Sequence, residues 1–261
     1  MMMNKIPEIN RARGYYVYTA NGKRYLDMAL EGGRLVMGHR QNGYAQAMKN
    51  VIDKGILPGY PSPYAHRLKQ AVKALVGDDC FVYLFPSEER AREAIGVLNA
   101  SDPINDPIKP ALNLEAAEFE LCDPMILLLP VPAAFAPGVV ISDTELPLED
   151  ESVSPVILAG AVCAVYNLIA FQKVADYSGW EKIGLLEACG KTPDADAGKW
   201  RVEMPYLYPL CEPDKYDAVW DAFFEAGIIL SPDYDKPSVL PPYDELSDGM
   251  RKKLLKLLAE C

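Results

Sequence analysis

Histidine is scarce in this sequence, and its cysteines are scattered. His39 and His66 are the two histidines among 261 residues, and none of the six cysteines stands in a C-x-x-C pair. A zinc site rich in histidine and a zinc ribbon are therefore not expected, and we predict no metal site. Scattered cysteines are typical of a reducing compartment, and the first residues lack the apolar run of a secretory signal, so we expect a cytoplasmic protein.

Basic residues are outnumbered by acidic ones. The chain has 26 lysines and arginines against 37 aspartates and glutamates, which gives a formal net charge of -11. A surface that binds nucleic acid needs clustered basic side chains to neutralise phosphates, and no such cluster is visible. We therefore expect small molecules or proteins as partners, and no nucleic acid.

Charge is absent from one long segment, residues 152–172, with the sequence SVSPVILAGAVCAVYNLIAFQ. Its length would suffice to cross a bilayer. Pro155 and Asn167 interrupt its apolar character, however, its N-terminal flank at 149–151 is acidic, and no basic cluster anchors either end. We interpret it as a buried element and expect no membrane association.

The remaining pattern predicts strands that alternate with helices, and hence an α/β fold. The strongest signal is Asn21-Gly22, which lies between alternating apolar and polar residues and predicts a hairpin over 15–28. The other predicted strands are 82–85, 125–131, 138–142, 200–207 and 227–232, and the predicted helices are 44–54, 65–76, 88–98, 214–226 and 248–258.

The stretch VYLFPSEERAREAIGVLNA, residues 82–100, predicts a buried strand followed directly by a helix. Ser87 is a suitable N-cap, and acidic residues in a first helical turn are favoured by the helix dipole. The same arrangement of strand and helix N-terminus often binds anions. Here that first turn carries two carboxylates, Glu88 and Glu89.

The N-terminal segment RGYYVYTANGKRYLDMALEGGRLVMGH resembles the opening of the class III aminotransferases, which are fold-type I enzymes that carry pyridoxal phosphate. The matching residues are Gly14, Asn21-Gly22, Tyr25-Leu26-Asp27 and Gly38-His39. The resemblance implies a reduced fold-type I architecture, with a mixed sheet, flanking helices and a small α+β subdomain built from the two chain ends. In chain order we expect an N-terminal segment (1–76), a reduced central α/β domain (77–190) and a C-terminal subdomain (191–261).

The family's phosphate motif, S-G-[ST]-E-A, matches the turn at Ser87. Glu88 stands in the place of the glycine, Glu89 in that of the second hydroxyl residue and Arg90 in that of the glutamate. The resemblance therefore implies a degenerate phosphate turn, because two carboxylates would repel a phosphate. Arg90 or Arg92 would offset part of this repulsion by folding back.

The family's cofactor-binding lysine has no counterpart in its usual place. Asp143 stands where the family has the aspartate that pairs with the pyridine nitrogen, and the lysine position falls near 159–161, which reads Ala-Gly-Ala. There is no lysine between Lys109 and Lys173. Lys173 is the nearest candidate for a relocated lysine, although a lysine at a helix end is also typical of a cap.

The segment between phosphate turn and lysine position is also too short for the family's complete cofactor domain. These features predict a truncated, degenerate family member without cofactor that acts by binding or regulation. The resemblance implies a homodimer, or a complex with a full-length aminotransferase.

Two alternatives remain open. One is a pyridoxal-phosphate enzyme that uses Lys173, and the other is an enzyme of unrelated chemistry in a residual pocket. The candidate residues of such a pocket are Tyr60, His66, Ser87 and Arg90.

Overall fold

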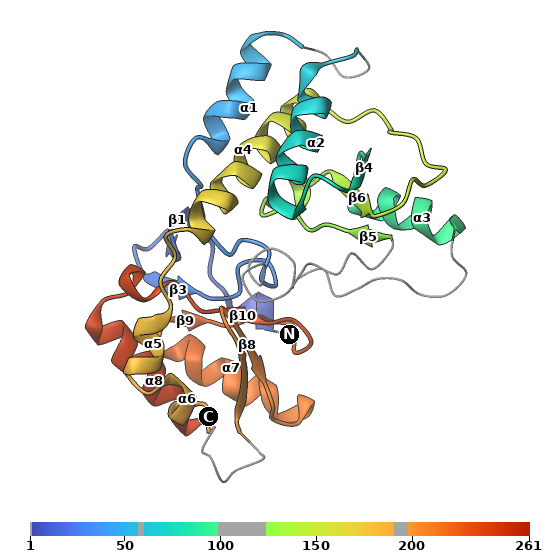
Figure 1. Ribbon diagram of the computed structural model, residues 1–261. Coiled ribbons are helices and arrows are strands. Elements are labelled where there is room, and N and C mark those ends of the chain that lie inside the picture. Colours follow the sequence, from blue (N-terminus) through green and yellow to red (C-terminus); the bar gives the residue numbers. More distant parts are fainter. Residues whose placement is uncertain (1, 57–59, 99–123, 191–197) are drawn as a thin grey trace. The chain divides into compact units, whose positions relative to one another are not determined.

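A computed structural model describes residues 2–56, 60–98, 124–190 and 198–261 (Figure 1). The chain forms two compact units. One consists of residues 41–173, and the other joins the two chain ends, residues 1–40 and 174–261. These units do not coincide with the three consecutive segments expected from the sequence, because residues distant along the chain pair with one another in the unit of the chain ends.

That unit contains a four-stranded sheet in the order β1-β2-β3-β9. Its strands are β1 (Ile9–Arg13), β2 (Tyr16–Thr19), β3 (Arg24–Asp27) and β9 (Ile228–Ile229). β2 and β3 form the predicted antiparallel hairpin, and Gly22 in its turn has φ 82°, a conformation that favours glycine. β3 pairs in parallel with β9, so that Leu26 lies opposite Ile228. The hairpin is therefore confirmed, and its sheet is mixed.

A second sheet of this unit corrects one prediction. β7 (Trp200–Glu203) and β8 (Tyr206–Pro209) pair antiparallel, and β10 (Ser238–Val239) pairs with the other edge of β8. The single strand predicted over 200–207 is therefore wrong. Pro205 interrupts that run, since proline cannot donate a ladder hydrogen bond, and the chain reverses there.

Helices complete the unit of the chain ends. They are α5 (Ser178–Lys182), α6 (Leu185–Ala188), α7 (Tyr216–Glu225) and α8 (Asp248–Glu260), with single 3₁₀ turns at Met2–Lys5, Pro213–Lys215 and Tyr243–Glu245. The core contains Trp180, Trp200 and Trp220, each at most 1% exposed. The indole of Trp180 donates to the carbonyl of Pro241 at 2.9 Å, and that of Trp220 to Leu230 at 3.0 Å. Trp180 and Trp220 are thus buried with their indole N–H groups partnered, whereas the buried indole N–H of Trp200 has no partner among the described residues.

The second unit is built around α4 (Pro155–Gln172), which packs against α1 (Tyr44–Asp53) and α2 (Pro63–Val76) (Figure 1). Gly160 permits the close approach of α1, because a Cβ added there would lie 2.9 Å from Cε2 of Tyr44 and 3.0 Å from Cγ of Met48. By length and composition alone, α4 could cross a membrane, with a mean hydropathy of 1.7. Within this protein 44% of it is buried, and the core helix of a globular protein meets the same criteria of length and composition.

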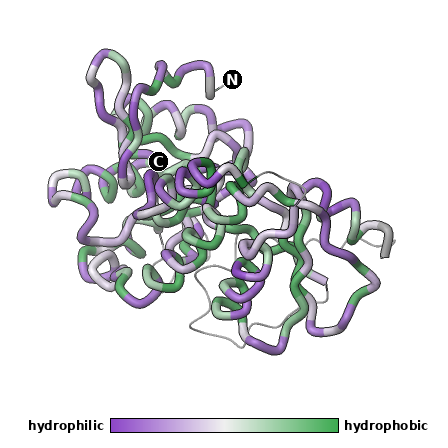
Figure 2. The backbone as a smooth tube through the Cα atoms, turned by 90° about the horizontal axis from the view of Figure 1, so that it is seen from above, coloured by the Kyte–Doolittle hydropathy of each residue, from purple (hydrophilic) through white to green (hydrophobic). Residues whose placement is uncertain are grey.

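A three-stranded antiparallel sheet lies beside these helices, in the order β4-β6-β5. Its strands are β4 (Phe81–Phe85), β6 (Gly138–Ser142) and β5 (Met125–Ile126), and α3 (Glu88–Leu98) and a 3₁₀ turn (Ala133–Phe135) adjoin it. Figure 2 colours the hydrophobic segments of the chain green. The predicted strands at 82–85 and 138–142 are confirmed. Of the strand predicted over 125–131, only Met125–Ile126 forms a strand, and the N–H of Leu127 adds one hydrogen bond to the carbonyl of Val139.

Candidate functional site

The turn between β4 and α3 is the place where the sequence predicts a degenerate phosphate site. Ser87 caps the helix as predicted: its Oγ accepts from the backbone N–H of Arg90 at 3.2 Å, and its carbonyl from Ala91 at 3.1 Å. Gly138 of β6 lies against the same turn, since a Cβ there would fall 2.2 Å from the carbonyl oxygen of Ser87. The hydroxyl and the carbonyl of Ser87 are therefore both used within the protein.

Negative charge surrounds this turn. Glu88 and Glu89 occupy the first turn of α3. Arg90 points to other carboxylates, at 2.7 Å from Glu93 and 2.8 Å from Glu151. Its hydrogen bonds to Glu151 and Glu93 raise the pKa of its guanidinium, which stays charged. Arg90 thus does not fold back to compensate the two glutamates of the turn.

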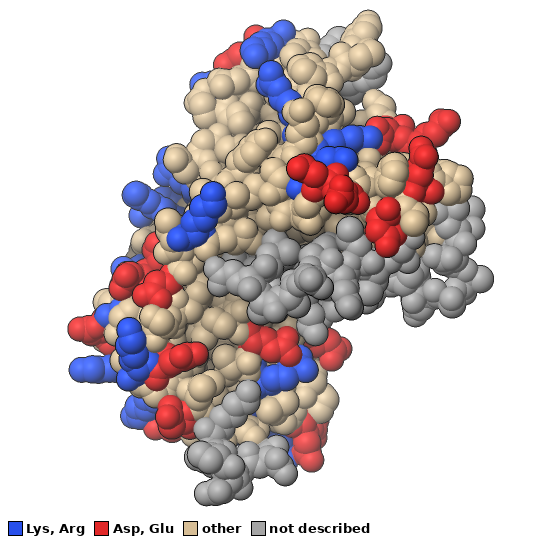
Figure 3. Space-filling view, viewed as in Figure 1, with Lys and Arg blue, Asp and Glu red and all other residues tan. Residues whose placement is uncertain are grey.

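The loop after β6, residues 143–151, adds further carboxylates beside β4. Oδ1 of Asp150 accepts from the backbone N–H of Leu84 at 2.9 Å, and its Oδ2 lies 2.6 Å from Nζ of Lys69. The N–H of Glu151 donates to the carbonyl of Leu84 at 2.9 Å. Figure 3 shows acidic side chains gathered over α3 and this loop. These contacts fix the acidic loop next to the turn.

The residues present do not fit pyridoxal phosphate as the resembled family holds it. A phosphate at the start of α3 would face the carboxylates of Glu88 and Glu89, and at close range such repulsion is of the same order as the gain from a helix terminus. The expected lysine position, 159–161, lies in the buried middle of α4 and offers no amine. Asp143 is exposed directly after β6.

The other predicted residues lie apart from this turn or on the surface. Lys173 is the exposed C-cap residue of α4, and its backbone N–H donates to Ala170 at 3.3 Å. Tyr60 is 71% exposed, and His66 is exposed on α2. Of the four residues predicted to form a residual pocket, Ser87 and Arg90 are therefore the two that are neighbours, at the α3 turn. Within the described residues, no three histidine, cysteine, aspartate or glutamate side chains gather to hold a metal ion.

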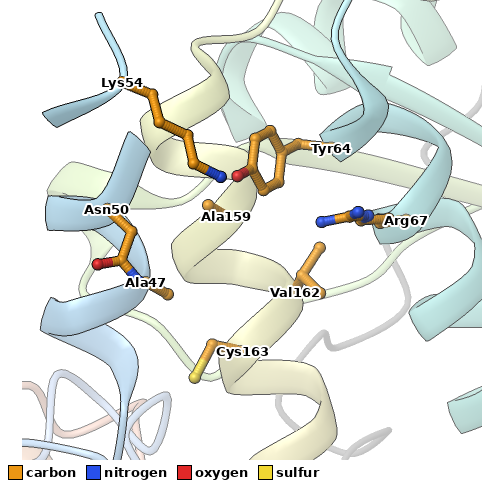
Figure 4. A pocket seen from close by; sticks show the side chains of 8 residues that line it. All are labelled: Ala47, Asn50, Lys54, Tyr64, Arg67, Ala159, Val162 and Cys163. Carbon is orange, nitrogen blue, oxygen red and sulfur yellow. The ribbon is translucent and has the colours of Figure 1, made fainter. Parts of the chain in front are cut away.

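A cavity of about 330 Å³ lies between α1, α2 and α4 (Figure 4), and neither Tyr60 nor His66 lines it. Its polar lining residues, which sequence reasoning missed, are Asn50, Lys54, Tyr64, Arg67 and Cys163. One available signal was the spacing of Tyr64 and Arg67, which places both on the same face of a helix. The contribution of the other two helices had no local signal.

Residues that carry the N-terminal resemblance come together in the unit of the chain ends. The imidazole Nε2 of His39 lies 2.8 Å from Oδ2 of Asp27, whose Oδ1 accepts from the N–H of Ala29 at 2.9 Å. Gly14 and His39 exchange two backbone hydrogen bonds, at 3.2 and 2.7 Å. Gly38, with φ 74°, lies so close that a Cβ would be 2.6 Å from the Gly14 oxygen. These residues hold the glycine-rich turn in place.

Sequence comparison finds two relatives similar over nearly the whole chain. They are uncharacterized proteins of Borreliella burgdorferi, 25% identical over 92% of this chain and 86% of that protein, and of Treponema pallidum, 24% identical over 92% and 91%. A glutamate-1-semialdehyde 2,1-aminomutase of Thermus thermophilus is 34% identical over 67 residues, which are 26% of this chain and 16% of that enzyme. No family model matches.

Solved structures resemble the chain over almost its full length. The ornithine delta-aminotransferase of Plasmodium falciparum superposes with a TM-score of 0.66 at 17% identity, covering 97% of this chain and 91% of the other. An omega-transaminase of Sphaerobacter thermophilus gives 0.70 at 10% identity, with 97% and 90% covered. The N-acetylornithine aminotransferase of Stenotrophomonas maltophilia gives 0.65 at 14% identity, with 98% and 95% covered.

Proposed function

We propose, from the premise that this chain has the fold of the fold-type I aminotransferases and shares partial homology with the aminomutases among them, that it acts by binding and has lost pyridoxal-phosphate catalysis. The expected reduced α/β architecture of fold type I is confirmed by the solved structures that it resembles. The role that we assign to the chain is binding or regulation, without a resident cofactor.

The observation that carries the proposal is the electrostatics at the start of α3. The helix terminus offers an anion site in principle, yet its first turn presents Glu88 and Glu89, and the neighbouring Arg90 is already paired with two carboxylates. A desolvated phosphate there would gain a few hydrogen bonds and meet two negative charges. Repulsion at such distances is on the order of several kcal/mol in a partly buried site.

Two further observations support it. No lysine occurs from 110 to 172, and the buried helix α4 occupies the region where the resemblance places the cofactor-binding lysine. The chain also covers 86% and 91% of its uncharacterized relatives from Borreliella burgdorferi and Treponema pallidum, so similar chains occur in both organisms. The missing lysine supports a protein that is adapted to a task other than transamination.

Reduction with borohydride in the presence of pyridoxal phosphate tests the proposal. The purified protein is expected to be colourless and, after reduction and peptide mapping, to carry no stoichiometric adduct at a specific lysine. The matched control is Lys173→Ala, which removes the nearest lysine to the expected position. Trace labelling that is spread over exposed lysines is expected for both proteins, because any exposed amine reacts slowly with an aldehyde.

A stoichiometric yellow species whose reduction labels Lys173, and which Lys173→Ala abolishes, would overturn the proposal and favour an enzyme with a relocated lysine. Stoichiometric labelling of another single lysine would overturn it as well. Equal, low labelling of wild type and variant agrees with the proposal.

We also propose a homodimer in the cytoplasm, without membrane association. Support comes from β1, which is the outer strand of its sheet among the described residues, and from Tyr166 of α4, which is 50% exposed there. An apolar helix surface is costly in water, and a second copy is the simplest partner that covers it. A full-length aminotransferase is the alternative partner.

A further inference from the structure

The cavity between α1, α2 and α4 has an apolar floor and a polar rim. Ala159 and Tyr64 are buried at its base, with Ala47 and Val162 beside them. Its exposed polar residues, Asn50, Lys54 and Arg67, stand at the opening. All of these residues belong to the unit 41–173, so the cavity is complete within that unit.

The charges at this cavity are of one sign. Lys54 and Arg67 are its charged lining residues, and no carboxylate lines it. Figure 4 shows that the side chains of Lys54, Tyr64 and Arg67 converge above Ala159. The Arg67 guanidinium lies 5.4 Å from the centre of the Tyr64 ring, which orients it without neutralising it.

Neither cation has an ion-pair partner among the described residues. This contrasts with nearby cations of the same unit: Lys69 is 2.6 Å from Asp150, and Arg90 is paired with two glutamates. The chain as a whole carries a net charge of -11, so acidic partners were abundant. Two unpaired cations that share an apolar cavity in an acidic protein indicate an attraction for a ligand that brings its own negative charge.

We propose that this cavity binds a small organic anion, in which a carboxylate or phosphate meets Lys54 and Arg67 and a short apolar body lies on Ala159 and Val162. A guanidinium fork suits both anions, and an ammonium adds a point charge. The volume of about 330 Å³ is at the low end of ligand sites, which favours a small ligand. This inference is independent of the loss of cofactor chemistry proposed above, because the cavity does not include the α3 turn.

Cys163 provides a reporter inside the cavity. Its Sγ donates to the carbonyl of Asn42 at 3.5 Å, and burial raises the pKa of its thiol. Iodoacetate and iodoacetamide both form an S–C bond with the thiolate and release iodide, but only iodoacetate is an anion. The rate with iodoacetate divided by the rate with iodoacetamide at one cysteine therefore reports the local attraction for anions.

The experiment measures this ratio at Cys163 by peptide mapping and divides it by the ratio at Cys211, which lies outside the cavity next to Glu212. The normalised ratio is expected to exceed one several-fold. Lys54→Gln and Arg67→Gln are each expected to lower it about threefold, as for exposed ion pairs. Arg92→Gln, which removes an exposed arginine of α3, is the matched control and should leave the ratio unchanged.

A normalised ratio near one, or the same ratio in wild type and in both cavity variants, would overturn the inference. Circular dichroism of each variant shows whether it is folded. If one cavity variant does not fold, the other and the wild-type ratio still decide the question, because the two substitutions lie on different helices.

Protection of Cys163 from iodoacetamide identifies the anion. Butyrate and inorganic phosphate are the probes, and neutral butyramide is the control. Protection by butyrate alone assigns a carboxylate with an apolar body, whereas protection by phosphate assigns a phosphate group. Equal protection by butyramide, or none by either anion up to tens of millimolar, would contradict an anion site.

Discussion

The hydroxyl of Tyr44 lies where α1 packs on α4, and it has no hydrogen-bond partner among the described residues. Burial, with a smaller contribution from Cys163, raises its pKa from the ordinary 10.0 to about 12. The unfolded chain therefore loses this proton at lower pH than the folded chain. The stabilisation associated with the neutral hydroxyl is fully present below pH 10 and is lost as the pH rises toward 12.

Tyr44→Phe removes both the unpartnered hydroxyl and its titration. At pH 7 we expect the free energy of unfolding to stay constant or to rise by up to about 1 kcal/mol, because no hydrogen bond is lost with the hydroxyl. Above pH 10 the variant is expected to lose less stability than wild type. Urea unfolding at pH 7, 9.5 and 10.5 measures both differences.

Tyr15→Phe is the matched control. The Tyr15 hydroxyl donates to the carbonyl of Val36 at 2.8 Å, so its loss is expected to cost about 1 kcal/mol at pH 7. Equal losses in the two variants at pH 7 would contradict the interpretation of Tyr44 as an unpartnered group. They would place a hydrogen-bond acceptor near its hydroxyl.

At the scale of single residues, the sequence predicted those contacts that join residues close together along the chain. Ser87 was recognised as an N-cap because it accepts from Arg90, three residues away. The cavity cations were not recognised, because Lys54 and Arg67 are joined only through the packing of α1 and α2 on α4. A site assembled from three helices leaves no local pattern in any of them.

At the scale of elements, the start of α3 is a helix terminus with Glu88 and Glu89 in its first turn, and we propose that these side chains block its capacity to bind an anion. Glu88→Gly combined with Glu89→Ser restores the glycine and hydroxyl residue of the family motif. We expect this double variant to bind inorganic phosphate at the α3 terminus more tightly than wild type, because two like charges are removed and backbone N–H groups are exposed. Calorimetric titration measures the gain in affinity.

Transamination is not expected in the double variant, since the substitutions supply no lysine at 159–161. Because the cavity is a second candidate anion site, the titration is repeated with Lys54→Gln and Arg67→Gln added to both proteins. Unchanged phosphate affinity in this background would contradict the electrostatic block and indicate that the turn does not admit an anion.

Most elements were predictable, and the exceptions have physical causes. The hairpin at Asn21-Gly22 was found because its turn chemistry and alternation agree. β1 (Ile9–Arg13) was missed because it is a mostly exposed edge strand without an apolar face. The run at 200–207 contains two strands, and greater weight on Pro205 would have revealed the break.

At the scale of the whole molecule, self-association is the main expectation. Light scattering at micromolar concentration is expected to give twice the chain mass of 28.8 kDa. Tyr166→Glu places a charge at the exposed aromatic side chain of α4 and is expected to shift the protein toward the monomer, because a buried unpaired charge is costly. Lys252→Glu, an exposed change on α8, serves as the control.

A wild-type mass of one chain would contradict the homodimer. In that case the well-matched segment 14–39 serves only its own unit, where Tyr25 and Leu26 are already buried. A dimer that both variants retain would exclude α4 as its interface and direct attention to the edge of β1.

The parallel pairing of β3 with β9 has a consequence for how the protein is made. Leu26 lies opposite Ile228, so β3 is made about 200 residues before the strand with which it pairs. At about 5–20 residues per second, a ribosome needs roughly 10 to 40 s to bridge that interval. Residues 41–173 emerge within it as a self-contained unit and can fold first. Synthesis thus leaves β3 without its parallel partner, and open to chaperones and proteases, until Ile228 has been made.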